Sequence, residues 1–178
     1  MIKKADLFTG DEVRRMLKRM SHQIVERNHG ADKLCLIGIH RRGVPLAGQI
    51  AENMAAICGT APPLGSLDIT LYRDDLEQTQ PSPALLGSNI SFDVTGQTII
   101  LVDDVIYTGR TARAAMDAVF TGGRPAQVQL AVLIDRGHRE LPIRPDYVGK
   151  NIPSAHNEVI SVLVDEYDGT TGVELFEK

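Results

Sequence analysis

Two adjacent carboxylates follow the clearest predicted strand of the chain. Residues 98–102 form a short hydrophobic run that is typical of a buried strand, and Asp103 and Asp104 come directly after it. Open α/β sheets bind their ligands at the carboxyl ends of their strands, where these two acids would lie. Neighbouring carboxylates can accept hydrogen bonds from both hydroxyls of a vicinal diol. The pair therefore indicates a sugar site, although either acid alone could also cap a helix.

A phosphate-binding turn is predicted a few residues later. A helix is expected to begin at about Arg110, so the backbone amides of Thr108, Gly109, Arg110 and Thr111 would point outward at its N-terminus. Unpaired amides and the helix dipole make such a terminus an anion site. Gly109 lets the backbone approach closely, and the threonine hydroxyls add donors. A phosphate cradle beside a diol clamp fits a ribose 5-phosphate, although an ordinary turn could contain the same Thr-Gly pair.

Alternating strands and helices are expected to hold these residues in place. Thr9 and Glu12 form a predicted capping box, and the apolar residues that follow recur at helical spacing. The alternation is typical of an α/β protein with a doubly wound, mostly parallel sheet. One domain is expected over 1–178, with a small hood at about 135–160 above the sheet edge. The strands are expected at 34–39, 68–72, 98–102, 128–134 and 159–164, and the helices at 10–27, 44–57 and 110–120.

The composition excludes several classes of protein. The 178 residues are 43% hydrophobic and 24% charged with a net charge of −4, which gives no overall basic signature for nucleic-acid binding. Cys35 and Cys58 lack the spacing of a metal or redox pair, so both are expected to be small buried residues. The chain begins without the apolar run of a signal peptide, and no stretch is long enough to span a membrane. A cytoplasmic protein is expected.

The segment 99–111 resembles the 5-phosphoribosyl pyrophosphate (PRPP) signature of the type I phosphoribosyltransferases. Roughly residues 7–165 are similar to the PyrR family of pyrimidine operon regulators, which are also uracil phosphoribosyltransferases. This resemblance implies a type I phosphoribosyltransferase fold and a reaction in which uracil and PRPP give UMP and pyrophosphate. The stretches that carry it are 68–75, 102–104, 107–111, 135–144 and 150–153.

The resemblance also assigns roles to individual residues. The loop 40–43 is implied to hold pyrophosphate, and its cationic side chains suit a group with several negative charges. A flexible loop that begins at Tyr72 and Arg73 and continues through 74–88 is implied to close over the site and exclude water. The predicted catalytic residues are Asp103, Asp104, Tyr72 and Arg73. The residues expected to bind PRPP or UMP are His40, Arg41, Arg42, Gly43, Asp103, Asp104, Val105, Ile106, Tyr107, Thr108, Gly109, Arg110 and Thr111.

The pyrimidine base is implied to bind at Arg136, Ile152 and Ile160. Pyrophosphate would leave through a cation-like transition state, so positioning and electrostatics should dominate catalysis. Magnesium is expected to bind mainly to oxygens of the substrate and to water, with no site made of protein ligands alone. No residue stands out as an obligatory general base for the uracil nitrogen.

The resemblance further implies binding to the leader of a pyrimidine operon mRNA in response to UMP, and assembly into a homodimer or a higher homo-oligomer. A basic face on the first helix is a candidate for contacting RNA phosphates, although such a face is often only solvated. Two alternatives stay open, a nucleotide-sensing RNA-binding regulator with vestigial catalysis and a salvage enzyme that binds no RNA. The candidate RNA-binding residues are Arg14, Arg15, Lys18, Arg19 and His22 on the helix, with Arg27, His138, Arg139, Arg144 and Lys150 as a possible extension.

Overall fold

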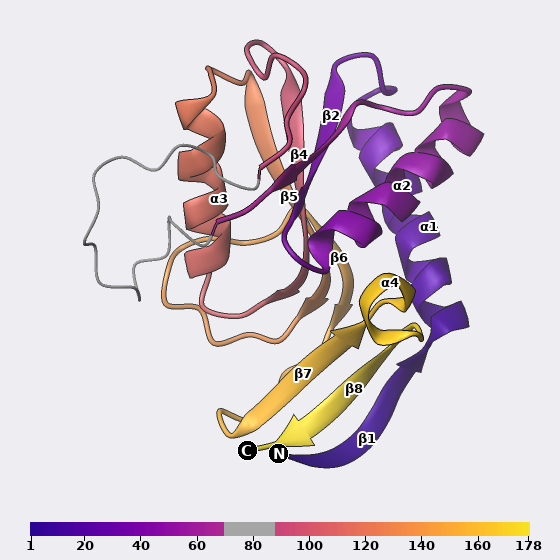
Figure 1. The fold of residues 1–178 in the computed structure, drawn as a ribbon, viewed down its shortest axis with the longest axis vertical. Coiled ribbons are helices and arrows are strands. Elements are labelled where there is room, and N and C mark those ends of the chain that lie inside the picture. The colour runs from indigo at the N-terminus through magenta and orange to yellow at the C-terminus, as the bar shows by residue number, and fades with distance from the viewer. Residues whose placement is uncertain (70–87) are drawn as a thin grey trace.

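The computed structural model describes residues 1–69 and 88–178, and Figure 1 shows their arrangement. The predicted catalytic residues Tyr72 and Arg73 lie outside the described residues, as does nearly all of the predicted closing loop 74–88. The roles proposed for them therefore stay predictions.

Five parallel strands form the central sheet, in the order β3-β2-β4-β5-β6. Because β2 and β4 are neighbours while the chain leaves them toward opposite edges, the topological switch point lies between them, where open α/β sheets bind ligands. The strands are β2 (Leu34–Ile39), β3 (Leu64–Leu67), β4 (Thr98–Ile106), β5 (Gln127–Asp135) and β6 (Tyr147–Asn151).

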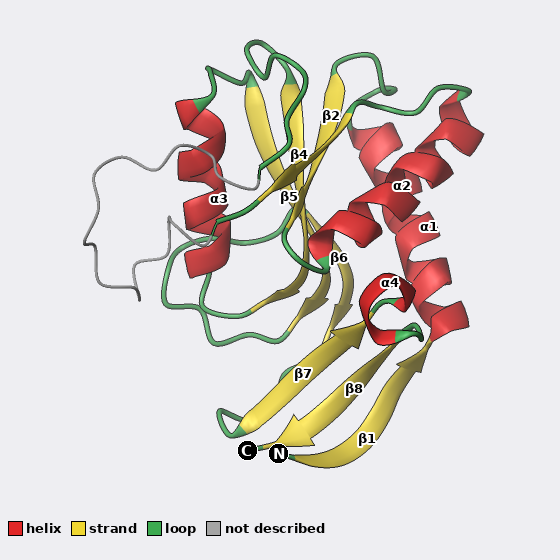
Figure 2. Ribbon diagram, viewed as in Figure 1, coloured by secondary structure: helices red, strands yellow, loops and turns green. Residues whose placement is uncertain are grey.

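Helices cover both faces of this sheet, as Figure 2 shows. Helices α1 (Gly10–Arg27) and α2 (Gly43–Cys58) pack on one face, and α3 (Arg110–Thr121) packs on the other. Successive residues of β4 alternate between the two cores, with Ile100 facing α1 and α2 and Ile99 facing α3. The prediction of a doubly wound, mostly parallel α/β sheet is confirmed.

The first helix begins as its sequence predicts. Glu12 accepts a hydrogen bond from the Thr9 amide at 2.8 Å, and Thr9 Oγ1 accepts one from the Glu12 amide at 3.4 Å. These two bonds form the predicted capping box. The apolar stripe from Val13 to Ile24 is buried, whereas the basic residues of α1 lie on its exposed side.

A second, antiparallel sheet stands at the carboxyl ends of the central strands (Figure 1). It contains β1 (Ile2–Thr9), β8 (Gly172–Glu177) and β7 (Glu158–Leu163), in that order, and the short helix α4 (Asp165–Asp168) joins β7 to β8. The strand expected at 159–164 is present as β7, but it belongs to this second sheet and not to the central one. This sheet and α4, which we call the hood from here on, draw on both ends of the chain, and β7 overlaps in part with the hood expected at about 135–160.

Two local expectations differ from the structure. The strand expected at 68–72 is preceded by β3 at Leu64–Leu67, while Asp68 and Ile69 are not in a strand and residues 70–72 lie outside the described part. Cys35 is buried as expected, but Cys58 is exposed because it is the last residue of α2, one turn beyond the last buried residue of that helix. Of the helices described, none is long and apolar enough to cross a membrane.

Two glycines bring the start of α2 against the ends of β2 and β4. A Cβ atom at Gly43 would lie 2.3 Å from the carbonyl oxygen of Val102, and one at Gly38 would lie 2.5 Å from the Cα of Val44. These separations are shorter than van der Waals contact, so neither position has room for a side chain. The close approach places the loop that precedes Gly43 beside the end of β4.

Gly43→Ala should lower the free energy of unfolding by about 2 kcal/mol or more, because its methyl group would overlap the backbone of β4. Urea unfolding measures this change. Gly48→Ala in the same helix is the matched control, since a Cβ there meets no atom within 4 Å. The control should be stabilising by about 0.5–1 kcal/mol. Equal stability of the Gly43→Ala protein and the parent would contradict the described packing.

Candidate functional site

The loops that follow β2 and β4 enclose a hollow at the switch point of the sheet. The hollow has a volume of about 370 Å³, and a second hollow of about 270 Å³ adjoins it on the α3 side. Asp103, Val105 and Thr111 line both. The first is lined by His40, Arg41, Asp68, Ile69, Asp103, Asp104, Val105 and Thr111, and the second mainly by Asp103 and residues 105–112 of the predicted phosphate turn.

The two carboxylates belong to neighbouring residues near the carboxyl end of β4. Asp103 Oδ1 accepts a hydrogen bond from the Asp104 amide at 2.9 Å, and Asp104 Oδ1 accepts one from the Val105 amide at 2.8 Å. Burial, and then the negative charge of Asp104, raise the pKa of Asp103 well above its usual value. A pair of this kind favours a cationic or hydroxyl-bearing ligand, because such a ligand relieves the repulsion between the two acids.

The phosphate turn has the predicted form. Gly109 occupies the left-handed region at φ 94° and is the N-cap of α3, and no described side chain caps this helix. The first amide to bond a carbonyl within the turn is that of Arg113, which donates to Gly109 at 3.0 Å. The Arg110 amide donates to Thr108 Oγ1 at 3.3 Å. The helix terminus therefore faces the second hollow with few partners within the helix, as an anion site requires.

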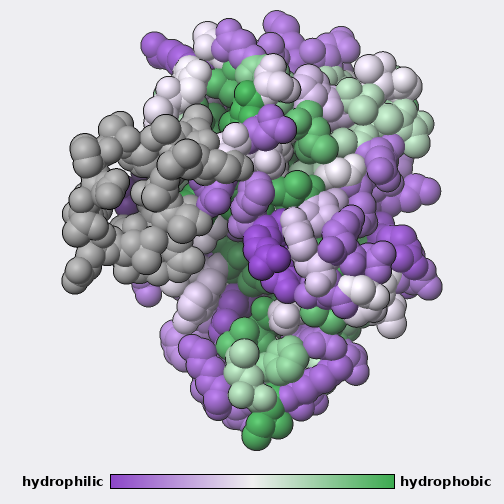
Figure 3. All heavy atoms as spheres, viewed as in Figure 1, coloured by the Kyte–Doolittle hydropathy of each residue, from purple (hydrophilic) through white to green (hydrophobic). Residues whose placement is uncertain are grey.

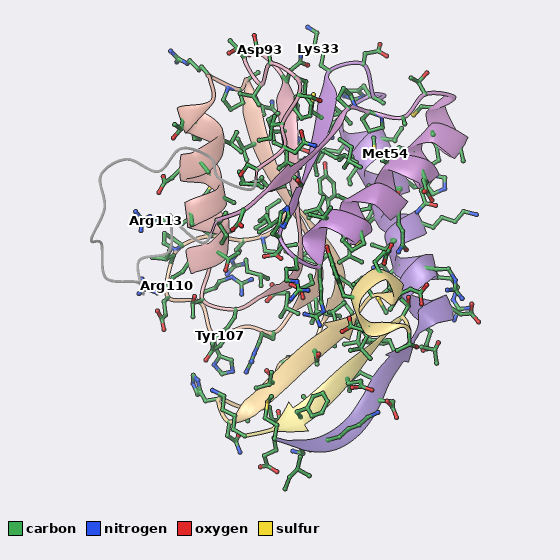
Figure 4. The ribbon with its side chains drawn as sticks, in the orientation of Figure 1. Lys33, Met54, Asp93, Tyr107, Arg110 and Arg113 are labelled. Carbon is green, nitrogen blue, oxygen red and sulfur yellow. The ribbon has the colours of Figure 1, made fainter. Side chains whose placement is uncertain are left out.

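Figure 4 shows Tyr107 and Arg110 at the edge of the sheet that faces the hood, whereas Lys33 and Asp93 lie at the opposite edge. The Arg110 Nε donates to Glu140 at 2.8 Å, so its guanidinium joins α3 to the segment that follows β5. Tyr107 is 36% exposed and lies between the phosphate turn and the hood.

The two arginines of the loop after β2 have different surroundings. The peptide bond between His40 and Arg41 is cis, and Arg41 lines the first hollow as expected. Arg42 does not line it. Its guanidinium instead binds both oxygens of Asp168 in the hood, at 2.8 and 3.2 Å. Sequence reasoning placed both arginines at the ligand, but the structure brings only the first to the hollow.

The segment after β5 supplies a buried cation. Arg136 is 6% exposed, its Nη2 donates to the carbonyl of Ala155 at 3.0 Å, and its guanidinium stands 4.3 Å from the centre of the Tyr107 ring. Its Nε is buried without a hydrogen-bond partner among the described residues. An unsatisfied buried donor of this kind is suited to a carbonyl oxygen of a ligand.

The other two predicted base-binding residues have different surroundings. The amide of Ile152 donates to the carbonyl of Asp135 at 2.8 Å, which holds this residue beside the segment of Arg136. Ile160 is 6% exposed and belongs to the hydrophobic core that β7 shares with α1 and α2. Ile160 is therefore a packing residue in this structure.

The basic face predicted on α1 exists, and all five of its residues are exposed. Arg15, Arg19 and Lys150 line one hollow of about 380 Å³ between α1 and β6. Arg19 also donates to the carbonyls of Val148 and Gly149, which attaches α1 to that strand.

Other predicted RNA-binding residues have partners within the protein. Arg14 pairs with Asp11, and Arg27 pairs with Asp146 at 2.8 Å. Arg139 is half-buried, and its guanidinium donates to Asp135 at 2.6 Å and to the carbonyl of Tyr107 at 2.9 Å. The His138 ring bonds the carbonyl of Ser154 and stands 4.0 Å from the ring of His156. The structure thus gives Arg139 and His138 internal roles, whereas Arg144 and Lys150 are exposed.

Sequence reasoning missed three residues near the first hollow. Asp68 lines it directly, and Tyr167 and Asp168 contact the loop arginines. Asp68 could have been found, because it follows a strand whose carboxyl end meets the same sheet edge. Tyr167 and Asp168 follow a strand of the other sheet, so spacing along the sequence carries no signal for them.

The acidic groups around the first hollow suit a hard cation. Asp68, Asp103 and Asp104 offer oxygen atoms, which are the ligands that Mg²⁺ prefers. Within residues 1–69 and 88–178, no three His, Cys, Asp or Glu side chains are grouped closely enough to hold a metal ion by themselves. A magnesium ion that brings ligands from its substrate fits this arrangement.

Comparison with known proteins agrees with this geometry. A family model for the phosphoribosyl transferase domain matches residues 6–167. The bifunctional protein PyrR of Thermus aquaticus is 57% identical over 175 residues, which covers 98% of this chain and 97% of that protein. The bifunctional protein PyrR of Deinococcus radiodurans is 54% identical over 174 residues, which covers 98% of this chain and 95% of that one.

Solved structures with the same fold include hypoxanthine phosphoribosyltransferases. A variant from Trypanosoma cruzi has a TM-score of 0.78 at 21% identity, with 99% of this chain and 96% of that chain covered. The enzyme from Staphylococcus aureus has a TM-score of 0.73 at 16% identity, with 99% and 93% covered. At these identities the likeness shows the fold alone.

Asp103→Asn should make the free protein more stable at pH 7. The pKa of Asp103 is raised, so over the pH range above 3.8 the folded chain holds a proton that the unfolded chain has lost. The free energy of unfolding should therefore fall as the pH rises through this range, and the Asn variant should lose that dependence. Chemical unfolding between about pH 4 and pH 8 measures it.

Asp93→Asn is the matched control for this pH dependence. Hydrogen bonds from Thr95 lower the pKa of Asp93, so its contribution to stability is present above its unfolded pKa and is lost as the pH falls. The control should therefore weaken the protein at neutral pH, with the opposite sign. If the parent and the Asp103→Asn variant showed the same dependence of the free energy of unfolding on pH, the raised pKa of Asp103 would be contradicted.

Proposed function

This chain belongs to the phosphoribosyl transferase family and, within it, to the PyrR proteins, and on that basis we propose that it makes UMP and pyrophosphate from uracil and PRPP. We further propose that it regulates pyrimidine operon expression by binding the mRNA leader in response to UMP. The observation that carries the enzymatic proposal is the position of Asp103 and Asp104 directly beside the phosphate turn.

The shared lining of the two hollows supports this assignment. The 5-phosphate of the substrate would bind the amides at the start of α3, next to Gly109, in the second hollow. The ribose hydroxyls would then reach Asp103 and Asp104, which lie at the boundary with the first hollow. The pyrophosphate would extend into the first hollow toward His40 and Arg41. One extended ligand thus uses all three groups of residues.

The chemistry proposed for these residues is mainly electrostatic. When the bond from the ribose carbon to pyrophosphate breaks, positive charge develops on the sugar, and the carboxylates of Asp103 and Asp104 stabilise it. Arg41 attracts the departing negative charge. Bound magnesium would supply charge neutralisation on the pyrophosphate, with Asp68, Asp103 and Asp104 as the protein oxygens near it. The Nε of Arg136, which has no hydrogen-bond partner among the described residues, would donate to a carbonyl of the pyrimidine.

A specific observation favours the regulatory function as well. Arg15, Arg19 and Lys150 come from two elements and line one hollow, in which Glu12 is the only acid among the described residues, so positive charge is in excess there although the chain as a whole carries a net charge of −4. Convergent cations suit a phosphate backbone better than cations scattered along a helix. Arg14, Arg27, His138 and Arg139 are left out of this proposed surface because none of them lines this hollow.

Two further assignments come from the sequence and from the family resemblance, the first for the location and the second for the assembly. A cytoplasmic location and assembly as a homodimer or higher homo-oligomer stay predictions. Figure 3 shows small, separate hydrophobic areas on one face of the molecule, among hydrophilic residues.

Replacing both acids, Asp103→Asn and Asp104→Asn, should lower phosphoribosyl transfer to uracil by about 100-fold or more, because the developing charge on the ribose loses its partners. Formation of UMP from uracil and PRPP measures this loss. Orotate and hypoxanthine serve as competing bases with the parent protein. Parental activity in the double variant would refute the assignment of the acids, and a preference for hypoxanthine would refute the pyrimidine substrate.

Arg15→Gln and Lys150→Gln together should weaken binding of a pyrimidine leader RNA and reduce the slope of log affinity against log salt by about 1 for each lost phosphate contact. A salt titration in the presence of UMP measures both effects. Lys33→Gln, at the opposite edge of the sheet (Figure 4), is the control and should leave them unchanged. An equal loss in the control would place the RNA elsewhere, and no RNA binding by the parent would leave an enzyme alone.

A further inference from the structure

The short helix α4 contacts the loop 40–43, which is expected to bind pyrophosphate. Arg42 Nη2 donates to Asp168 Oδ1 at 2.8 Å and Nε donates to Oδ2 at 3.2 Å, so the guanidinium and the carboxylate meet through two hydrogen bonds. The two residues are 126 positions apart in the sequence. This bond raises the pKa of Arg42 and lowers the pKa of Asp168, so both groups stay charged.

The carboxylate of Asp168 has a fixed position of its own. Its Oδ2 also accepts a hydrogen bond from the amide of Val164 at 2.9 Å, and the Asp168 amide donates to the Val164 carbonyl at 2.8 Å. Val164 is fully buried in the core between the two sheets. Gly169 then closes the turn in the left-handed region, at φ 67°. The position of Asp168 is therefore fixed by its bonds to Val164 and does not depend on its contact with the loop.

A second contact joins the same two segments. The guanidinium of Arg41 stands 4.9 Å from the centre of the Tyr167 ring, within the range of a cation–π interaction. Arg41 also lines the first hollow, whereas Arg42 does not. Neighbouring residues of α4 thus hold neighbouring arginines of the loop, one at the hollow and one away from it.

We propose that Tyr167 and Asp168 are positioning residues for the departing pyrophosphate. Asp168 fixes Arg42 and with it the course of the loop, and Tyr167 supports Arg41 at the rim of the hollow. The inference rests on the proposed phosphoribosyl transfer and adds that the turn between β7 and β8 sets the affinity for PRPP. Neither residue touches the reacting atoms.

Steady-state kinetics with PRPP and uracil tests this role. Asp168→Asn removes the charge but keeps an oxygen for the Val164 amide, and Tyr167→Leu removes the ring. Each should raise KM for PRPP by roughly fivefold or more and weaken inhibition by pyrophosphate, while kcat and KM for uracil change by less than about twofold. Tyr167→Phe keeps the ring and should recover most of the lost affinity for PRPP. Asp165→Asn, an exposed acid in the same turn, is the matched control.

The outcomes separate the alternatives. An unchanged KM for PRPP in both variants would overturn the inference. A lower KM for PRPP in Asp168→Asn would overturn it too, because Asp168 would then compete with the ligand for Arg42. If the parent forms no UMP from uracil, the proposed function fails, and calorimetric titration with PRPP and with pyrophosphate still tests the inference. Weaker binding in both variants would then support it, and unchanged binding would reject it.

Discussion

Repulsion between Asp103 and Asp104 is the constraint around which the site is arranged. The main chain places both carboxylates at the end of a buried strand, where burial and mutual charge raise the pKa of the first. The free protein bears this cost, and the ribose of the proposed substrate would relieve it. The surrounding elements serve the same pair, because α3 presents its amides on one side and the loop after β2 presents a cation on the other.

The two sheets position different residues of the candidate site. The parallel sheet places the acids and the phosphate turn through local connections, in which each strand is followed by its own loop. The antiparallel sheet contributes from outside the parallel sheet, because Asp168 and Tyr167 follow its strand β7 and contact the loop arginines. The loop 40–43 therefore depends on a segment near the carboxyl end of the sequence, although the proposed site residues lie mainly in its middle.

Local physics explains what could be predicted from the sequence. Three features depend only on residues close in sequence, so they could be predicted from it. They are the capping box of Thr9 and Glu12, the apolar run before Asp103 and the glycine before α3. The strand β1 was not predicted, because its pairing with β8 depends on residues more than 160 positions away. For the same reason, sequence reasoning gave Arg42 to the ligand and Arg139 to RNA. Arg42 binds Asp168, 126 positions away, and Arg139 donates to the carbonyl of Tyr107, 32 positions away, so the fold supplies these partners. Arg139 also binds Asp135, which is only four residues earlier in the sequence.

The pairing of β1 with β8 also joins the two ends of the chain. Ile2 lies opposite Glu177 in the register of these antiparallel strands, and Figure 1 shows the N and C ends next to each other. A short peptide could connect them as a hairpin turn connects two strands, without disturbing either sheet. The fold is thus close to a closed ring, and the break between Ile2 and Glu177 is one of several places at which that ring could be opened. Circular permutants are a direct consequence of this geometry.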